Sequence, residues 1–189
     1  MKQSIGMAAE PPRISAIDRR LAWARLAGAL FAEHDRSIEF DGYRLLGVLG
    51  RGATGTVYLA HDPTLEREVA IKLLEGGDRA ATLHEARALA RVAHPSVVAI
   101  HQVGDLDGLV YIVMERLRGH DLRSWQRGRA WPEVVRMYAE LARGLGCAHR
   151  QGVVHRDFKP ENVLVDEHGR GRPRCQLRRS CPRSRSITM

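Results

Sequence analysis

The chain has 189 residues, 44% of them hydrophobic, and a formal net charge of +8. This length and composition suit a globular domain with an apolar core. No apolar run approaches the ~18 residues of a spanning helix, and no apolar signal core follows the start, so we expect no membrane segment and a cytoplasmic location. The three cysteines form no C-x-x-C pair, which argues against a disulfide framework or a zinc site.

The positive charge is concentrated at the C-terminus. Residues 168–189 contain seven arginines and no acidic residue, which leaves the remainder close to neutral. Arginine-rich segments can bind nucleic acid, but no aromatic side chain interrupts this one for base stacking, so we do not expect nucleic acid as a partner. The chain has 27 Arg and only 3 Lys: Lys2, Lys72 and Lys159. Because lysine provides a compact point charge that arginine does not, the two internal lysines are functional candidates.

The pattern of apolar residues, glycines and prolines predicts strands first and helices later. A helix is expected in an N-terminal extension, over residues 15–34. Strands are expected within residues 40–63, 67–75 and 97–117, the last as a hairpin around 104–108. Helices are expected over 80–92, with Leu83, Ala86, Ala90 and Val92 buried, and over 132–149, with Pro132 in the first turn. This order favours an α+β fold with two lobes over an alternating βαβ fold.

The first motif is the glycine-rich stretch LGRGATGTVYLA, in which Gly50, Gly52 and Gly55 form G-x-G-x-x-G. Glycines let a backbone approach phosphate oxygens closely. Dinucleotide-binding proteins use the same spacing, but there a helix follows the glycines, whereas TVYLA is strand-like. The motif therefore favours a β-hairpin that covers a bound nucleotide. A glycine-rich hairpin turn without a ligand is the plainer interpretation.

The second motif is VAIK, which ends at Lys72. A lysine at the end of an apolar strand can reach the surface or can bind phosphate with the help of an acidic partner. Glu85, on the next expected helix, is the candidate partner.

The third motif is HRDFKPENVLV, residues 155–165. Asp157 can accept a proton from a hydroxyl, Lys159 can reach a phosphoryl group, and Asn162 offers an oxygen to Mg²⁺. Such a loop positions reactants and neutralises charge, which is most of what phosphoryl transfer requires.

With these motifs in this order, residues 40–165 resemble the eukaryotic-like (Hanks-type) serine/threonine protein kinase family. The resemblance implies a kinase-like two-lobed fold, with an antiparallel sheet and one helix in the N-lobe and a helical, incomplete C-lobe. It implies ATP and Mg²⁺ as cofactors and an unknown protein as substrate. The implied catalytic residues are Asp157, Lys159, Lys72 and Glu85, and Asn162 is the implied metal ligand.

The resemblance also implies an ATP-binding set. His155 would pack internally and Arg156 would await a phosphorylated activation loop. The implied ATP-binding residues are Leu49, Gly50, Gly52, Gly55, Val57, Ala70, Lys72, Met114, Glu115, Leu117 and Leu164.

The resemblance stops where a D-F-G motif would carry the main metal-binding aspartate, because no Asp follows Asp166. We therefore expect a truncated kinase, with a catalytically inactive nucleotide-binding or interaction module as the alternative function. The expected divisions are an extension at 1–37, an N-lobe at 38–118, a partial C-lobe at 119–167, and a basic tail at 168–189. That tail is expected to be disordered or the product of a shifted reading frame.

Overall fold

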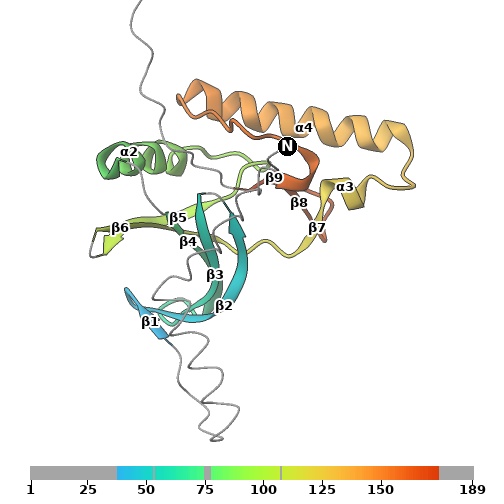
Figure 1. The fold of residues 1–189 in the computed structure, drawn as a ribbon. Coiled ribbons are helices and arrows are strands. Elements are labelled where there is room, and N and C mark those ends of the chain that lie inside the picture. The colour runs from blue at the N-terminus through green and yellow to red at the C-terminus, as the bar shows by residue number, and fades with distance from the viewer. Residues whose placement is uncertain (1–37, 53, 75–77, 107, 175–189) are drawn as a thin grey trace, which may run out of the picture.

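The structure is a computed structural model, and it describes residues 38–52, 54–74, 78–106 and 108–174. The helix expected over 15–34 lies outside the described residues, as do residues 175–189. The described chain forms two lobes (Figure 1), a large sheet with one helix and a smaller sheet with a long helix.

The N-terminal lobe is built on a six-stranded sheet in the order β1-β2-β3-β4-β6-β5, in which every neighbouring pair is antiparallel. Strands β1 to β4 pair in succession through short turns, and so do β5 and β6, as the glycines and the alternating apolar residues of the sequence predict. The strands are β1 (Ile38–Phe40), β2 (Tyr43–Gly52), β3 (Gly55–Asp62), β4 (Arg67–Leu74), β5 (Ile100–Leu106) and β6 (Leu109–Glu115).

The two faces of the sheet enter two different apolar cores. On β4, Val69, Ile71 and Leu73 pack in one core, while Ala70 and Leu74 pack in the other. Because successive side chains of a strand point to opposite faces, Lys72 shares the face of Ala70 and Leu74. This is the face covered by helix α2 (Arg79–Ala90), which begins where the Asp78 side chain accepts hydrogen bonds from the amides of residues 80 and 81.

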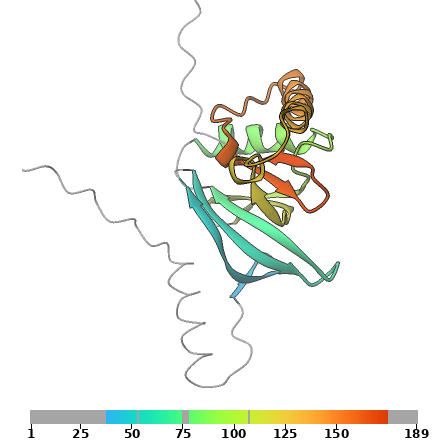
Figure 2. The same cartoon turned by 90° about the vertical axis from the view of Figure 1, so that its right-hand side faces the viewer.

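The C-terminal lobe combines helix α4 (Trp131–Arg150) with a small antiparallel sheet. Its apolar core joins the buried face of α4 to α3 and β8 through Leu122, Met137, Leu141, Val163 and Val165. Figure 2, in which α4 is seen nearly end-on, shows α2 and α4 at the same end of the large sheet. The remaining elements are β7 (Gly119–Asp121), α3 (Leu122–Trp125), the short 3₁₀ helix η1 (Pro160–Asn162), β8 (Val163–Asp166) and β9 (Gly171–Pro173).

Strand β9 departs from the expectation that the chain becomes an unstructured basic tail at residue 168. Residues 171–173 instead pair with β8 and pack against α4. A Cβ atom at Gly171 would lie 2.5 Å from the Sδ of Met137, so a residue without a side chain allows this close approach. The basic segment therefore contributes a strand to the C-terminal lobe.

The buried face of α2 also differs from the expected one. Ala90 is exposed, whereas Leu89 is buried together with Ala86. Ala86 and Leu89 are three residues apart and so lie on one side of the helix, facing the sheet. The expected burial of Ala90 was wrong, because the buried position at this end of the helix is Leu89, one residue earlier.

Two glycines of α4 offer a test of the packing between the lobes. A Cβ at Gly144 would lie 3.0 Å from both Cβ and the carbonyl oxygen of Ser96, while one at Gly146 would meet only the end of Arg150 at 3.8 Å. We expect Gly144→Ala to lower the free energy of unfolding by about 1–3 kcal/mol through overpacking. Gly146→Ala should raise it by about 0.5–1 kcal/mol, because alanine loses less conformational freedom in a helix.

Urea denaturation of the two variants measures these changes, and each variant is the control for the other. Equal effects of both substitutions would contradict the packing of α4 against Ser96.

Candidate active site

A cavity of about 250 Å³ opens between the lobes. It is bounded by the β2–β3 hairpin, by β4, by the end of β6 with the connection that follows it, and by β8. The residues that line it are Leu49, Gly50, Val57, Ala70, Val98, Met114, Glu115, Leu117, Leu164 and Arg174.

Most of the ATP-binding residues implied by the sequence lie in this lining. The exceptions are Gly52, Gly55 and Lys72, which belong to the tip of the hairpin and to β4. Sequence reasoning missed Val98 and Arg174. Val98 follows helix α2 in a segment without a periodic signal, and Arg174 stood among the arginines of the expected tail.

The glycine-rich motif forms the turn of the β2–β3 hairpin. Gly50 is opposite Val57, and Gly52 is opposite Gly55. Gly55 has φ +129°, and a Cβ there would lie 1.8 Å from the carbonyl oxygen of Leu73, so only glycine fits. The motif leads from strand to strand, as TVYLA predicts, and this excludes the strand-to-helix turn of a dinucleotide-binding fold.

Lys72 lies next to this hairpin and is almost completely buried, with 4% of its surface exposed. It is opposite Val57 on β3 and Ile112 on β6, so it is in the middle of the sheet. Its ammonium group donates a hydrogen bond of 2.8 Å to Oγ1 of Thr54, in the turn of the hairpin. The strand therefore carries this cation to the glycine-rich turn.

Glu85 lies on α2 and does not form the expected ion pair with Lys72. Among the described residues, the charge that acts on its carboxylate is that of Arg156. Burial raises the pKa of Glu85, and the positive charge of Arg156 opposes that rise only in part. Arg156, which the resemblance implies would contact a phosphorylated activation loop, thus contributes to the electrostatics of α2.

The motif HRDFKPENVLV forms a loop that brings Asp157, Lys159 and Asn162 together. The amide nitrogen of Asn162 donates to the backbone oxygen and to Oδ2 of Asp157, both at 2.9 Å. Nζ of Lys159 lies 3.5 Å from the same Oδ2. The turn requires a left-handed backbone at Arg156, with φ +59°. An acceptor of protons, a cation and an amide oxygen therefore converge in one loop.

His155 is a structural member of this loop. Its Nε2 lies 3.0 Å from the carbonyl oxygen of Arg174, and its ring packs edge-on against Phe158. Burial lowers the pKa of His155, so the ring is neutral at physiological pH. A neutral imidazole that donates from Nε2 ties Arg174, the residue after β9, to the loop.

Comparison with known proteins agrees with this geometry. The family model described as "Protein kinase domain" matches residues 43–176. The serine/threonine-protein kinases PknE and PknJ of Mycobacterium bovis are each 38% identical to this chain, over 143 and 146 residues that make up 71% and 73% of it. The match covers 25% of each relative, so the chain spans about a quarter of the length of these proteins.

The kinase domain of PknI from Mycobacterium tuberculosis is a similar solved structure. It has a TM-score of 0.64 and 28% sequence identity, over 74% of this chain and 61% of that one. A double mutant of the same domain gives a TM-score of 0.66 at 27% identity. Because the family model matches well over half of the chain, and the relatives and the fold agree with it, this chain belongs to the protein kinase domain family, in its serine/threonine branch.

Proposed function

We propose that this chain binds ATP in the cavity between its lobes, as part of a kinase that transfers the γ-phosphoryl group to a serine or threonine hydroxyl of a protein. The observation that carries the proposal is the lining of that cavity, which combines apolar side chains with the backbone that follows β6. Ligand cavities of this kind bury an apolar ring system and orient it with a few polar groups.

In this proposal the adenine lies between Val57 and Ala70 on one side and Leu164 on the other. The backbones of Glu115 and Leu117 meet the polar edge of the base. Gly50, Gly52 and Gly55 cover the phosphates, and Lys72 contacts the α- and β-phosphates. Family resemblance assigns these roles, and the cavity lining is compatible with them.

The transfer itself would use the loop after α4. The substrate oxygen forms a bond to the γ-phosphorus while the bond to the β–γ bridging oxygen breaks, and Asp157 takes the hydroxyl proton. Lys159 would compensate the negative charge of the phosphoryl group in transit. ADP and a phosphorylated side chain are the products.

Mg²⁺ would neutralise charge on the phosphates when it is bound. Within the described residues, no cluster of three or more His, Cys, Asp or Glu side chains could hold a metal ion. The oxygen donors at this place are Asn162 and Asp157, which suit Mg²⁺ only together with phosphate oxygens, as is usual for this ion. Asn162 is well placed for this role because its amide nitrogen is already engaged with Asp157.

A nucleotide-binding module without phosphoryl transfer is the second candidate. It is favoured by one observation: no aspartate follows Asp166 in the sequence, so the D-F-G aspartate of the family has no counterpart in it. Both candidates require ATP to bind, and only the first requires the transfer. For either, we propose a cytoplasmic location, where ATP is available. No helix of the described residues is long and apolar enough to cross a membrane.

One prediction of this proposal concerns Lys72 and the phosphates. In a thermal-shift titration, ATP with Mg²⁺ should raise the melting temperature of the wild-type chain, because a ligand that binds only the folded state stabilises it by about 2.7 kcal/mol at 100 times its Kd. Lys72→Met keeps the aliphatic stem but removes the charge. We expect it to lose most of the ATP response and to keep the response to adenosine, which carries no phosphate.

The response to adenosine is the control, because a variant whose cavity has collapsed would lose it together with the response to ATP. If ATP fails to stabilise the wild-type chain, ATP binding is wrong. If Lys72→Met responds to ATP as the wild type does, the assigned role of Lys72 is wrong.

Another prediction concerns the charge of Glu85. Because burial raises its pKa above the ordinary value of 4.5, the folded state holds this proton more tightly than the unfolded state does. Ionised Glu85 therefore costs stability at neutral pH, and the cost disappears when the pH falls below 4.5. We expect Glu85→Gln to be more stable than the wild type at about pH 7, with a difference that shrinks toward pH 4.5.

Urea denaturation at a series of pH values measures this difference, and other titrating groups cancel because both proteins carry them. A difference that does not change with pH would contradict the cost of burying this charge. The same variant should bind ATP more weakly, because Lys72 would lose its acidic partner in the nucleotide complex.

A further inference from the structure

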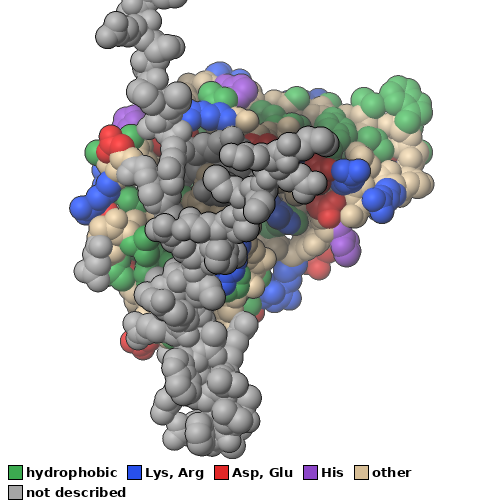
Figure 3. All heavy atoms as spheres, in the orientation of Figure 1, with side chains coloured by type: hydrophobic (Ala, Val, Ile, Leu, Met, Phe, Trp, Pro, Cys, Tyr) green, Lys and Arg blue, Asp and Glu red, His purple; other side chains and the backbone are tan. Residues whose placement is uncertain are grey.

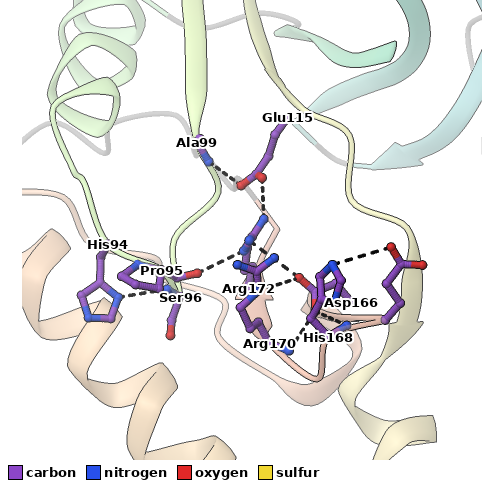
Figure 4. Close-up of polar contacts among 10 residues, drawn as sticks. His94, Pro95, Ser96, Ala99, Glu115, Asp166, His168, Arg170 and Arg172 are labelled. Atoms are coloured by element: carbon purple, nitrogen blue, oxygen red, sulfur yellow. Dashed lines mark hydrogen bonds and ion pairs between the residues drawn. The ribbon is translucent and has the colours of Figure 1, made fainter. Parts of the chain in front are cut away.

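A buried cation lies directly behind the cavity and is not part of its lining. Arg172, on β9, exposes only 9% of its side chain. Figure 4 shows its guanidinium between the end of β6 and the segment that joins α2 to β5. Nε donates to the carbonyl oxygen of Pro95 at 3.0 Å, Nη1 donates to Oε2 of Glu115 at 2.5 Å, and Nη2 lies 3.7 Å from Oδ2 of Asp166.

Three separate segments of the chain therefore meet at one side chain. Pro95 precedes Ser96, which packs against Gly144 of α4. Asp166 ends β8, and Glu115 ends β6. The planar guanidinium presents several N–H donors in fixed directions, which suits this set of partners better than an ammonium group would.

Glu115 is held on both sides by this arrangement. Its Oε1 accepts a hydrogen bond of 2.8 Å from the backbone amide of Ala99, and its own amide donates to the carbonyl oxygen of Ala99 at 2.9 Å. Its other carboxylate oxygen accepts from Arg172. The carboxylate thus points toward Arg172 (Figure 4), while the residue itself lines the cavity between the lobes. Arg172, its partners Pro95, Glu115 and Asp166, and Arg170 together form one cluster.

The cluster is balanced in charge. Arg172 contacts both Glu115 and Asp166, and Arg170 contacts Asp166. Burial acts against the ionised form of Asp166, but hydrogen bonds from the amides of Arg170 and His168 and the charge of Arg170 outweigh it and lower the pKa of Asp166. Without Arg172, the carboxylate of Glu115 would keep one backbone donor in a partly buried position, and it would turn toward water.

We propose that Arg172 is a positioning residue for the nucleotide site: by holding the Glu115 carboxylate, it sets the backbone edge of residues 115–117 that meets the adenine. The inference rests on the proposed binding of ATP. It also connects that edge to the C-terminal lobe, because the same guanidinium holds Pro95 and Asp166.

Arg170 offers a matched control. It lies on the same hairpin and pairs with Asp166 at 3.1 Å, but no hydrogen bond or ion pair joins it to Glu115 in the described part of the chain. Arg172→Met removes the donors to Glu115, Pro95 and Asp166. Arg172→Lys keeps the charge but not the fork of donors, and it serves if the methionine variant does not fold. Arg170→Gln removes an arginine and leaves the contact with Glu115 intact.

The experiment has two readouts. The first is hydrogen exchange of the Glu115 amide in the absence of nucleotide, which reports how firmly this edge is held. The second is the Kd of adenosine beside that of inorganic tripolyphosphate, which separates contacts with the base from contacts with phosphate. For Arg172→Met we expect the exchange rate of the Glu115 amide and the Kd of adenosine each to rise about tenfold. The Kd of tripolyphosphate should change by less than about twofold. Arg172→Lys should give about a threefold rise, and Arg170→Gln less than twofold.

The outcomes separate the two proposals. If the wild-type chain binds neither ligand, the proposed function fails, and hydrogen exchange alone decides whether Arg172 holds this edge. If adenosine and tripolyphosphate weaken together, Arg172 has a general structural role and the inference is overturned. An effect no larger than that of Arg170→Gln also overturns it. In a Glu115→Gln background, Arg172→Lys should have little further effect, because the two residues act through one contact.

Discussion

The pairing of β4 with β3 and β6 is the interaction on which the rest of the site depends. Antiparallel pairing on both sides places β4 in the middle of the sheet, and the alternation of side chains then separates two cores. Ala70 and Lys72 face the same way, so the residue that would lie over a base and the residue that would bind phosphate are fixed by one strand. A slip of one residue in this register would exchange the two faces.

Charge placement in the cleft follows from what each buried group can reach. Lys72 donates to Thr54 in the hairpin turn, and Glu85 lies within the influence of Arg156. In the family, lysine and glutamate of these motifs pair with each other around a bound nucleotide. The described arrangement leaves Glu85 with a carboxylate whose ionised form burial disfavours.

The contacts between the lobes differ in kind. The core shared by the sheet, α2 and α4 is apolar and includes Ala86, Val98 and Ala148, whereas Arg172 joins its three segments through hydrogen bonds and charge. The burial of apolar surface has no preferred direction, whereas a buried guanidinium has defined donor directions. Trp131 and Val135, at the N-terminal end of α4, are exposed. Figure 3 shows hydrophobic side chains gathered over this end of the helix.

Much of the fold could be predicted from the sequence because its signals are local. The hairpin of Gly50 to Gly55, the strand that ends near Lys72 and the loop of Asp157 to Asn162 each depend on neighbours in the chain. The helices predicted over 80–92 and 132–149 are confirmed as α2 and α4, within two residues at each end. The predicted hairpin is confirmed as β5 and β6, whereas the short helix α3 was not predicted. Most of the residues that line the cavity belong to the ATP-binding set that the family resemblance implied.

What only the tertiary structure decided is the partner of each charge and the role of the basic segment. Glu85 is under the influence of Arg156 because the folded chain brings them near, and nothing in the spacing of residues 85 and 156 indicates it. Arg172 was one of seven arginines in an expected tail, yet strand pairing carries it into a buried position beside Glu115. Short-range patterns determine strands, turns and helices, whereas the burial of a charge depends on segments that are distant in the sequence.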